Sequence, residues 1–563
     1  MIKVCENGRV NVETKTLNAV FQDGKLVRIV CRKSGNVFLD DDGTHKRAPL
    51  QLVFAGNNRV DLDPDCRNGD TEITKFSDSR VDFRFNTWNG VGILSISEDP
   101  ETGDLLVEPS GFSSRPGLRS VRWDIAGFRE DAEMVAPLFQ GVKAGLNDPM
   151  ICGSRFIYPY KWESNFVALH SGRDGIWIRS EDDPFRFRTL NIGDGADWNR
   201  IGLETETCGP ITGNLSAGGC VWRINVYEGD WTTPVKEYKK KLWDRLRLYH
   251  RLENKPEWMN GIRLAYSWCP TDRNILSELK RYIDPAKVLI HLPRWRKMGY
   301  DMGYPDYTPS EEAVAFVKEA TGMGYHVAPH FNAYEIDPTQ NDFESVRDFR
   351  FREIESKTAM GWAHDCGCVP VPENNLLLRS SQHHNVMTKI HPGHSMWRYL
   401  LEKSIAQAAE EINTDTVFLD VTHNVFNLDN ERVNDMTCGE GVLRLLHDVE
   451  KLRNGLTVGG EGLNEVVAPG QYFAQGHIYG PVNGAPADTV TPEKMCPVNR
   501  ILYEGVCSII GYHPHVGDAD QMKRTFALDD ARGFVPTLIG IGAGELRDPG
   551  PVVSGILERA LSE

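Results

Sequence analysis

The chain has 563 residues, of which 40% are hydrophobic and 25% are charged, and its formal net charge at pH 7 is −16. This length suits two or three domains whose cores need no disulfide or metal to hold them together. An acidic chain of this kind is repelled by polyanions, so we expect neither a nucleic acid nor a membrane surface as a partner.

The N-terminal sequence MIKVCENGRVNVET lacks the apolar stretch of a secretion signal. No uninterrupted apolar run reaches the ~18 residues of a membrane span. The 12 cysteines, without such a signal, predict reduced thiols and a cytoplasmic protein. Cys366 and Cys368 are spaced like metal ligands, but no second pair of ligands lies nearby, so neither a metal nor another cofactor is predicted.

Residues 1–230 predict a β-sandwich. Short alternating runs such as 25–31 and 91–97 are separated by turn formers such as Asn89-Gly90. The stretch 231–258 then predicts a linking helix, because apolar residues recur at helical spacing after Thr232 and Thr233, either of which suits an N-cap.

Residues 259–563 alternate between strand and helix patterns, which predicts a (β/α)8 TIM barrel. Expected strands are 262–267, 287–292, 325–332, 416–420, 457–461, 471–477, 506–512 and 534–539. Expected helices include 310–320, 394–412 and 441–453. A long insertion at about 337–392 is expected to shape a binding site or to reach a second copy in a homo-oligomer.

Two apolar runs of the predicted barrel end in a carboxylate, at Asp420 and at Glu461. Carboxylates at the C-terminal tips of barrel strands point into the mouth that holds the substrate. Cleavage of a glycosidic bond needs one ionised carboxylate at the anomeric carbon and one protonated carboxyl at the departing oxygen. We therefore predict a glycoside hydrolase with Asp420 as nucleophile and Glu461 as acid/base, and Glu465 competes for the second role.

Further polar and aromatic residues follow the other predicted strands. Alternate residues of a strand share a face, so His330 and Asn332 both point into the mouth, where they can bind sugar hydroxyls. The segment 293–307 is rich in aromatic residues, which stack on sugar rings. The predicted substrate-binding residues are Asp301, His330, Asn332, Trp295, Tyr300, Tyr304, Asp306, Trp268, His423, Asn424 and His513. Of these, Trp268, His423, Asn424 and His513 form a second tier together with His477, Tyr512 and His515.

The segments 299–307 (GYDMGYPDY) and 324–335 (GYHVAPHFNAYE), followed by Leu419-Asp420-Val421 and Gly460-Glu461-Gly462, resemble glycoside hydrolase family 101. That family consists of retaining endo-α-N-acetylgalactosaminidases. The resemblance covers about residues 260 to 470. It implies a sandwich related to galactose mutarotase before the barrel, the catalytic roles given above, and sugar contacts from Asp301, His330 and Asn332. Tyr300 stands where the family has a His.

The expected substrate is a small α-galactoside-like or α-N-acetylgalactosaminide-like glycoside or an oligosaccharide, cleaved by double displacement. Two alternatives stay open. One is a metal-dependent sugar epimerase or lyase, in which His330, Asp420, Glu461 and His513 gather around a divalent ion. The other is a non-catalytic carbohydrate-binding protein that has kept the barrel.

Overall fold

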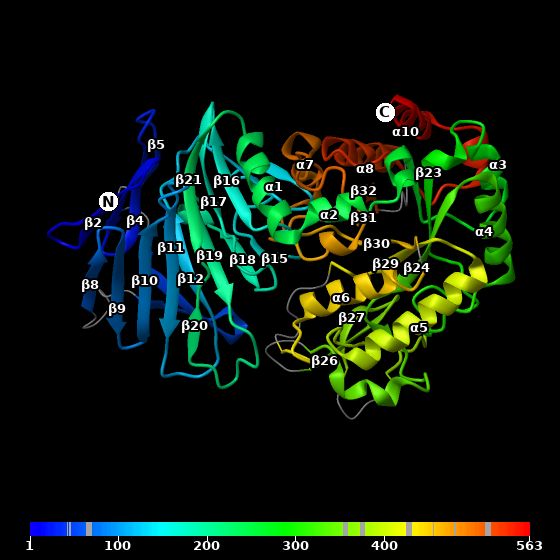
Figure 1. Cartoon of the computed structure of the whole chain (residues 1–563), viewed down its shortest axis with the longest axis horizontal. Coiled ribbons are helices and arrows are strands. Elements are labelled where there is room, and N and C mark those ends of the chain that lie inside the picture. The colour runs from blue at the N-terminus through cyan, green and yellow to red at the C-terminus, as the bar shows by residue number, and fades with distance from the viewer. Residues whose placement is uncertain are drawn as a thin grey trace. The chain divides into compact units, whose positions relative to one another are not determined.

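The structure is a computed structural model that describes residues 1–41, 43, 47–62, 70–352, 358–371, 378–423, 431–453, 455–477, 480–512 and 519–562. It divides into two compact units. The first consists of Met1–Leu242 with Tyr479–Lys494, and the second of Trp243–Ile478 with Met495–Glu563. The first unit is built mainly of antiparallel strands, and the second alternates strands with helices (Figure 1).

Three antiparallel sheets make up the first unit. A five-stranded sheet contains, in chain order, β1 (Ile2–Val4), β2 (Arg9–Glu13), β3 (Leu17–Gln22), β4 (Lys25–Cys31) and β5 (Val37–Asp40). A six-stranded sheet has the order β15 (Arg155–Tyr158), β18 (Arg188–Ile192), β19 (Arg200–Glu206), β12 (Leu118–Ala126), β6 (Leu50–Phe54) and β7 (Arg59–Leu62).

The ten-stranded sheet has the order β14 (Val142–Gly145), β13 (Glu133–Ala136), β16 (Phe166–Ser171), β17 (Asp174–Arg179), β21 (Trp222–Glu228), β11 (Leu105–Phe112), β10 (Gly90–Glu98), β9 (Arg80–Thr87) and β8 (Asp70–Ser77), with β20 (Ser216–Gly218) beside β11. On β11, buried residues such as Leu105 and Val107 alternate with more exposed ones, as expected of a strand with one face on a core. Every residue of β12 is buried, so both of its faces are covered.

The second unit contains an eight-stranded parallel sheet that curls into a barrel. Its order is β32 (Ser508–Gly511), β31 (Phe473–Gly476), β30 (Thr457–Glu461), β29 (Thr416–Asp420), β24 (His326–Asn332), β23 (Val288–Leu292), β22 (Leu264–Ser267) and β33 (Thr537–Ile539). A parallel bridge between Ile510 and Val535 joins the two edge strands. Ala265, Leu289, Ala328 and Phe418 are among the buried residues that fill the interior.

Helices precede, connect and follow the barrel strands. They are α1 (Thr232–Leu246), α2 (Leu248–Glu253), α3 (Asn274–Leu279), α4 (Glu311–Met323), α5 (Ser395–Ile412), α6 (Cys438–Glu450), α7 (Val498–Leu502), α8 (Ala519–Ala531), α9 (Ala543–Arg547) and α10 (Pro551–Ser562). The Ser310 hydroxyl accepts the backbone N–H of Ala313 and caps α4, which then ends at Gly324 in the left-handed region. Among the described residues, no helix has both the length and the apolar character needed to cross a bilayer.

The insertion after β24 forms a small antiparallel sheet of its own. Its order is β25 (Glu335–Ile336), β28 (Met387–Lys389), β26 (Ala359–Ala363) and β27 (Gly367–Val371). Glu335 is paired in register with Lys389, so the beginning and the end of the insertion lie side by side.

The predicted fold class is confirmed, since antiparallel sheets precede a nearly closed parallel barrel with helices. The strands that end at Asp420 and Glu461 have the predicted bounds. Helix α6 starts three residues before the predicted position, because Thr437 and Glu440 form a capping box. Helix α1 starts at Thr232, whose N–H is accepted by the Asp230 carboxylate rather than by a threonine.

Candidate active site

Asp420 and Glu461 are the last residues of two adjacent parallel strands, β29 and β30. The register pairs Leu419 with Gly460, so the two carboxylates follow each other at the same end of the barrel. The preceding residues, Val417 to Leu419, are fully buried in the barrel wall. Both carboxylates therefore stand at the C-terminal face, where barrel enzymes hold their substrates.

Glu461 is held from three directions. Its Oε2 accepts the backbone N–H of Val421 at 2.8 Å and lies 3.1 Å from Nδ1 of His423, and its Oε1 lies 2.7 Å from Nε2 of His477. Burial opposes ionisation of this carboxyl, but the two imidazoles outweigh it and hold the pKa of Glu461 well below its usual range. Glu461 is thus an anion in the free protein.

The pKa of Asp420 is shifted in the opposite direction. Burial raises its pKa well above the usual range, and the negative charges of Glu461, Asp301 and Glu335 raise it further. The Glu461 carboxylate is the largest of these charge effects on the pKa of Asp420. The pair therefore holds one proton, which resides on Asp420 in the absence of substrate.

Asp301 brings a third carboxylate to the same place. Its backbone is left-handed, with φ of 54°, a conformation that aspartate tolerates better than most residues. The Tyr304 hydroxyl donates to Oδ1 at 3.2 Å, and the indole N–H of Trp362 donates to Oδ2 at 3.1 Å. Burial raises the pKa of Asp301 although these donors oppose the rise.

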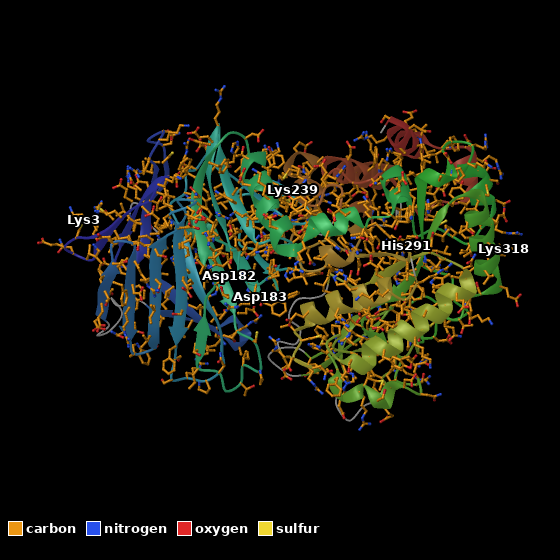
Figure 2. All side chains as sticks on the ribbon, viewed as in Figure 1. Lys3, Asp182, Asp183, Lys239, His291 and Lys318 are labelled. Atoms are coloured by element: carbon orange, nitrogen blue, oxygen red, sulfur yellow. The ribbon has the colours of Figure 1, made fainter. Side chains whose placement is uncertain are left out.

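A chain of neutral histidines lies beneath Asp420. Nε2 of His291 lies 3.2 Å from Nδ1 of His330, and Nε2 of His330 lies 3.6 Å from Oδ2 of Asp420. Burial lowers the pKa of His291 to about 3, and it lowers the pKa of His330 well below its usual range with help from His291. His291 is a buried residue of β23 (Figure 2), and the side-chain amide of Gln475 donates to Ser267 at 2.8 Å and to Nδ1 of His291 at 3.2 Å.

A buried ion pair supports the site from the insertion. Nζ of Lys389 donates to Oε1 of Glu335 at 2.9 Å, and the side-chain amide of Asn332 donates to Oε2 at 3.0 Å. Glu335 and Lys389 are 1% and 5% exposed, so neither charge is balanced by water. Lys389 supplies a fixed positive charge close to the carboxylates.

Aromatic rings surround the mouth. The ring centroid of Tyr300 lies 5.1 Å from that of Trp268 and 5.3 Å from that of His330. Nε1 of Trp268 and Nε2 of His330 are buried and have no hydrogen-bond partner within the described ranges. Because buried polar atoms are normally hydrogen-bonded, these two atoms are suited to bind polar groups of a ligand. A cavity of about 370 Å³ adjoins Tyr300, and Arg294 and Lys297 are among the residues that line it.

Some predicted residues contribute indirectly. Trp295 is fully buried and donates to the backbone oxygen of His330 at 2.9 Å, so it supports the strand from behind. Tyr304 is also fully buried and reaches the site through Asp301. Asn332 uses its amide for Glu335, and its oxygen accepts the backbone N–H groups of Tyr334 and Glu335.

Other predicted residues lie elsewhere. The Asp306 carboxylate accepts from Thr308 within its own turn, and Asp306 lines a cavity beside Gln407 of α5. Glu465 is fully buried and paired with Arg245. Asn424, His513 and the lower-ranked His515 lie outside the described residues.

Sequence reasoning missed Glu335, Trp362, His364 and Lys389. The last three belong to the long insertion, whose length was the only signal that it would shape the site. Nδ1 of His364 lies 3.6 Å from Oδ2 of Asp301. Their positions depend on pairing between β25, β26 and β28, which no local pattern specifies.

Two groups of side chains can hold a metal ion. One is His423, Glu461 and His477, and the other is Asp301, His330 and Asp420; within each group the ligand atoms lie within 4.8 Å of one another. These are the groups found among the described residues, and neither contains Cys366 or Cys368, which are exposed on the β26–β27 hairpin.

The similarity to known proteins lies in the fold. Residues 220–428 match the family model "Domain of unknown function (DUF6259)". No curated protein matches the chain. Among solved structures, the α-N-acetylgalactosaminidase NagBb from Bifidobacterium bifidum is similar in its complex with Gal-NHAc-DNJ, with a TM-score of 0.66 and 14% identity over 98% of this chain and 92% of that chain.

The GalNAc complex of NagBb gives a TM-score of 0.64 and 15% identity, and covers 100% of this chain and 92% of that chain. The GH36 α-galactosidase AgaB from Geobacillus stearothermophilus gives a TM-score of 0.47 and 7% identity over 100% of this chain and 86% of that chain. At these identities the likeness to NagBb establishes the fold. Membership of glycoside hydrolase family 101 stays a prediction.

Proposed function

We propose that this protein is a retaining α-glycosidase that acts on a small galactose-configured glycoside by double displacement. The observation that carries the proposal is the pair of carboxylates at the ends of adjacent barrel strands, Asp420 and Glu461, whose pKa values are driven apart. Glycoside cleavage requires one protonated carboxyl group and one ionised carboxylate.

In the proposed reaction, Asp420 attacks the anomeric carbon and Glu461 protonates the departing oxygen. A water molecule then attacks the glycosyl–Asp420 ester, and Glu461 accepts its proton. The ester breaks, and both carboxyls return to their starting states. Asp301, with its two oxygens fixed by Tyr304 and Trp362, accepts hydrogen bonds from sugar hydroxyls.

The proton must change place before the first step. In the free protein it resides on Asp420, while the mechanism needs it on Glu461. The two carboxyls end adjacent paired strands, so the proton has a short path between them. A sugar that develops positive charge beside Asp420 favours the ionised form of that residue, so the proton passes to Glu461 as the substrate approaches its transition state. A retaining mechanism requires the two carboxyls to lie ~5–5.5 Å apart when the substrate is bound.

The substrate class rests on two arguments. The solved structures of NagBb hold GalNAc and Gal-NHAc-DNJ in a barrel of the same fold. The unpartnered polar atoms of Trp268 and His330 and the ring of Tyr300 suit a sugar, which offers hydroxyls on its edge and C–H groups on its faces. We propose an α-galactoside or α-N-acetylgalactosaminide, with the leaving group in the cavity beside Tyr300.

The test is hydrolysis of p-nitrophenyl α-galactoside and α-N-acetylgalactosaminide, with the anomer of the first product read by NMR. Asp420→Asn should abolish turnover. Glu461→Gln should lower kcat by about 10²–10⁴-fold, because it removes the general acid. Asp306→Asn, a carboxylate outside the site, serves as the matched control and should retain activity. Wild-type turnover by Asp420→Asn, or an inverted first product, would refute the mechanism.

A metal-dependent reaction is the second candidate, because two histidines and a carboxylate converge at His423, Glu461 and His477. Two imidazoles and one carboxylate form a common ligand set for a divalent transition metal. Metal analysis after dialysis, with an EDTA activity test, separates the candidates. A stoichiometric metal whose removal abolishes turnover would favour the second; full activity after EDTA, with no bound metal, would eliminate it.

A further inference from the structure

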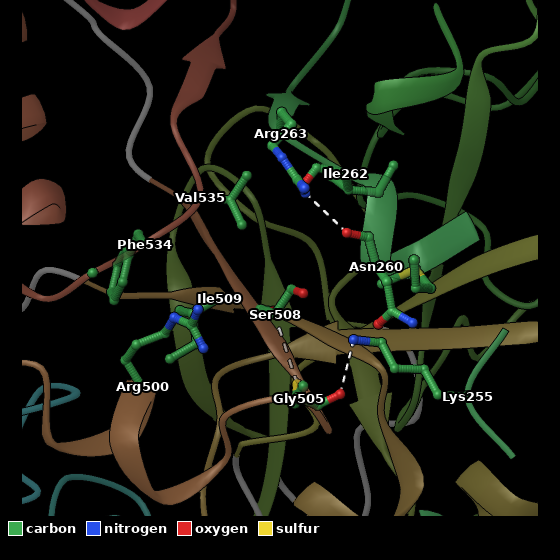
Figure 3. A pocket seen from close by; sticks show the side chains of 13 residues that line it. Lys255, Asn260, Ile262, Arg263, Arg500, Gly505, Ser508, Ile509, Phe534 and Val535 are labelled. Carbon is green, nitrogen blue, oxygen red and sulfur yellow. Dashed lines mark hydrogen bonds between the residues drawn. The ribbon is translucent and has the colours of Figure 1, made fainter. Parts of the chain in front are cut away.

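A second cavity lies at the opposite end of the barrel from Asp420. Its volume is about 430 Å³. Arg263 directly precedes β22, Ser508 is the first residue of β32, and Val535 comes two residues before β33, so the cavity opens where these strands begin (Figure 3). It is therefore separate from the candidate active site, which lies where the strands end.

The lining of this cavity is strongly cationic. Lys255, Arg263 and Arg500 all contribute to it, and none of the residues that line it is acidic. Across the described ranges, none of the three forms an ion pair with a carboxylate. Unbalanced positive charge is unusual in a chain whose net charge is −16.

The three cations are oriented by neutral groups. Lys255 donates to the backbone oxygen of Gly505 at 2.9 Å, and Arg263 donates to those of Asn260 and Ile262 at 2.9 and 3.0 Å. Arg500 extends into the cavity, and Ser508 stands between it and Lys255 in Figure 3. Burial lowers the pKa of Lys255, and the positive charge of Arg500 lowers it further.

We propose that this cavity binds a small, multiply charged oxyanion, such as a phosphate ester or a polycarboxylate. An oxyanion accepts charge-assisted hydrogen bonds from lysine and arginine, which are roughly twice as strong as neutral ones. It would also relieve the repulsion between Lys255 and Arg500. The Ser508 hydroxyl supplies a neutral donor, and the volume leaves room for an organic group attached to the anion.

The position of the cavity means that ligand binding should stabilise the closed barrel. The edge strands β32 and β33 meet through the bridge between Ile510 and Val535, to which the Val535 N–H contributes a hydrogen bond to the Ile509 oxygen at 2.8 Å. Lys255 and Arg263 precede the first barrel strand, whereas Arg500 precedes the seventh. An anion that contacts all three ties the beginning of the barrel to its end, and the folded state is stabilised because the unfolded chain lacks the site.

The experiment uses the full chain with pyrophosphate and citrate as separate probes, titrated by calorimetry and followed by thermal unfolding at constant ionic strength. We expect saturable binding of at least one probe and a Tm that rises with its concentration. Arg500→Ala and Lys255→Met should each weaken binding about tenfold or more, since each removes a charged contact. Lys318→Ala, on the exposed outer side of α4, is the matched control and should bind as the wild type does.

The outcomes are distinct. Binding of pyrophosphate alone identifies a phosphate ligand, and binding of citrate alone identifies a carboxylate ligand. Failure of both probes to bind at millimolar concentration, or equal binding by wild type, Arg500→Ala and Lys255→Met, would overturn the proposal. Asp420→Asn should bind the anion normally, so the result does not depend on the proposed hydrolase activity.

Discussion

Asp420 and Glu461 are neighbouring carboxylates whose surroundings push their pKa values in opposite directions. Two imidazoles stabilise the anion of Glu461, while Asp420 faces burial and three negative charges. The sequence predicted both carboxylates because each ends an apolar strand. It ranked His477 low and missed Lys389, because the contacts of these residues come from segments that are distant in the chain.

Lys389 is the residue on which the charge balance of the site depends. Lys389→Met should lower the free energy of unfolding by about 3–5 kcal/mol, because it leaves the Glu335 carboxylate buried and unpaired. The double variant with Glu335→Gln removes both charges and should recover part of this loss. Urea unfolding of the single and double variants measures both effects; equal stability of Lys389→Met and wild type would contradict the assigned role.

Asp529, near the end of α8, should make stability depend on pH. Burial raises its pKa to about 7, and Arg532 only partly opposes the rise. The folded state therefore holds this proton more tightly than the unfolded state. The resulting stability is fully present below pH ~4 and is lost as pH rises through about 7, a change of about 4 kcal/mol.

Asp529→Asn stays neutral at every pH, so it should remove this dependence. Relative to the wild type, the variant should gain unfolding free energy from about pH 4 upward and level off above about pH 7. Urea unfolding at a series of pH values checks the expectation. If the difference in unfolding free energy between the variant and the wild type is constant across that pH range, Asp529 does not titrate there.

At the scale of elements, the strand tips could be predicted more accurately than the segments around them. Apolar runs that end in Asp420 and Glu461 fix those strand bounds, and Ser310 marks the start of α4. The sheet of the insertion was not predicted, because β25 has two residues and owes its existence to its partners. An aromatic-rich loop does not reveal which of its side chains turn toward the mouth, and the Asp306 carboxylate accepts from Thr308 of its own turn.

Strand β30 is restricted by its glycines. A Cβ on Gly459 would lie 2.2 Å from the ring of Phe473, so Gly459→Ala should cost about 1–3 kcal/mol through overpacking. Phe473→Leu in the same chain should relieve part of the clash. Gly555 of α10 has open space around its Cβ position, so Gly555→Ala is the matched control and should stabilise by about 0.5–1 kcal/mol. Thermal unfolding measures the Tm of each variant. Equal Tm values for Gly459→Ala and Gly555→Ala would contradict the predicted overpacking.

At the scale of the whole molecule, a net charge of −16 makes self-repulsion the dominant long-range electrostatic effect. Moderate NaCl should therefore raise the Tm, since ~0.1 M salt limits the range of charge interactions to about 10 Å. A Tm series in NaCl measures the effect and supplies the baseline for the anion titration. A Tm that falls as salt is added would indicate that attractive ion pairs outweigh the repulsion.

The insertion after β24 leaves the barrel and returns at almost the same point, because Glu335 and Lys389 pair where it begins and ends. Its interior can therefore be lengthened, shortened or exchanged without moving a barrel strand. The insertion can thus vary in length and sequence while Asp420 and Glu461 keep their places at the ends of β29 and β30.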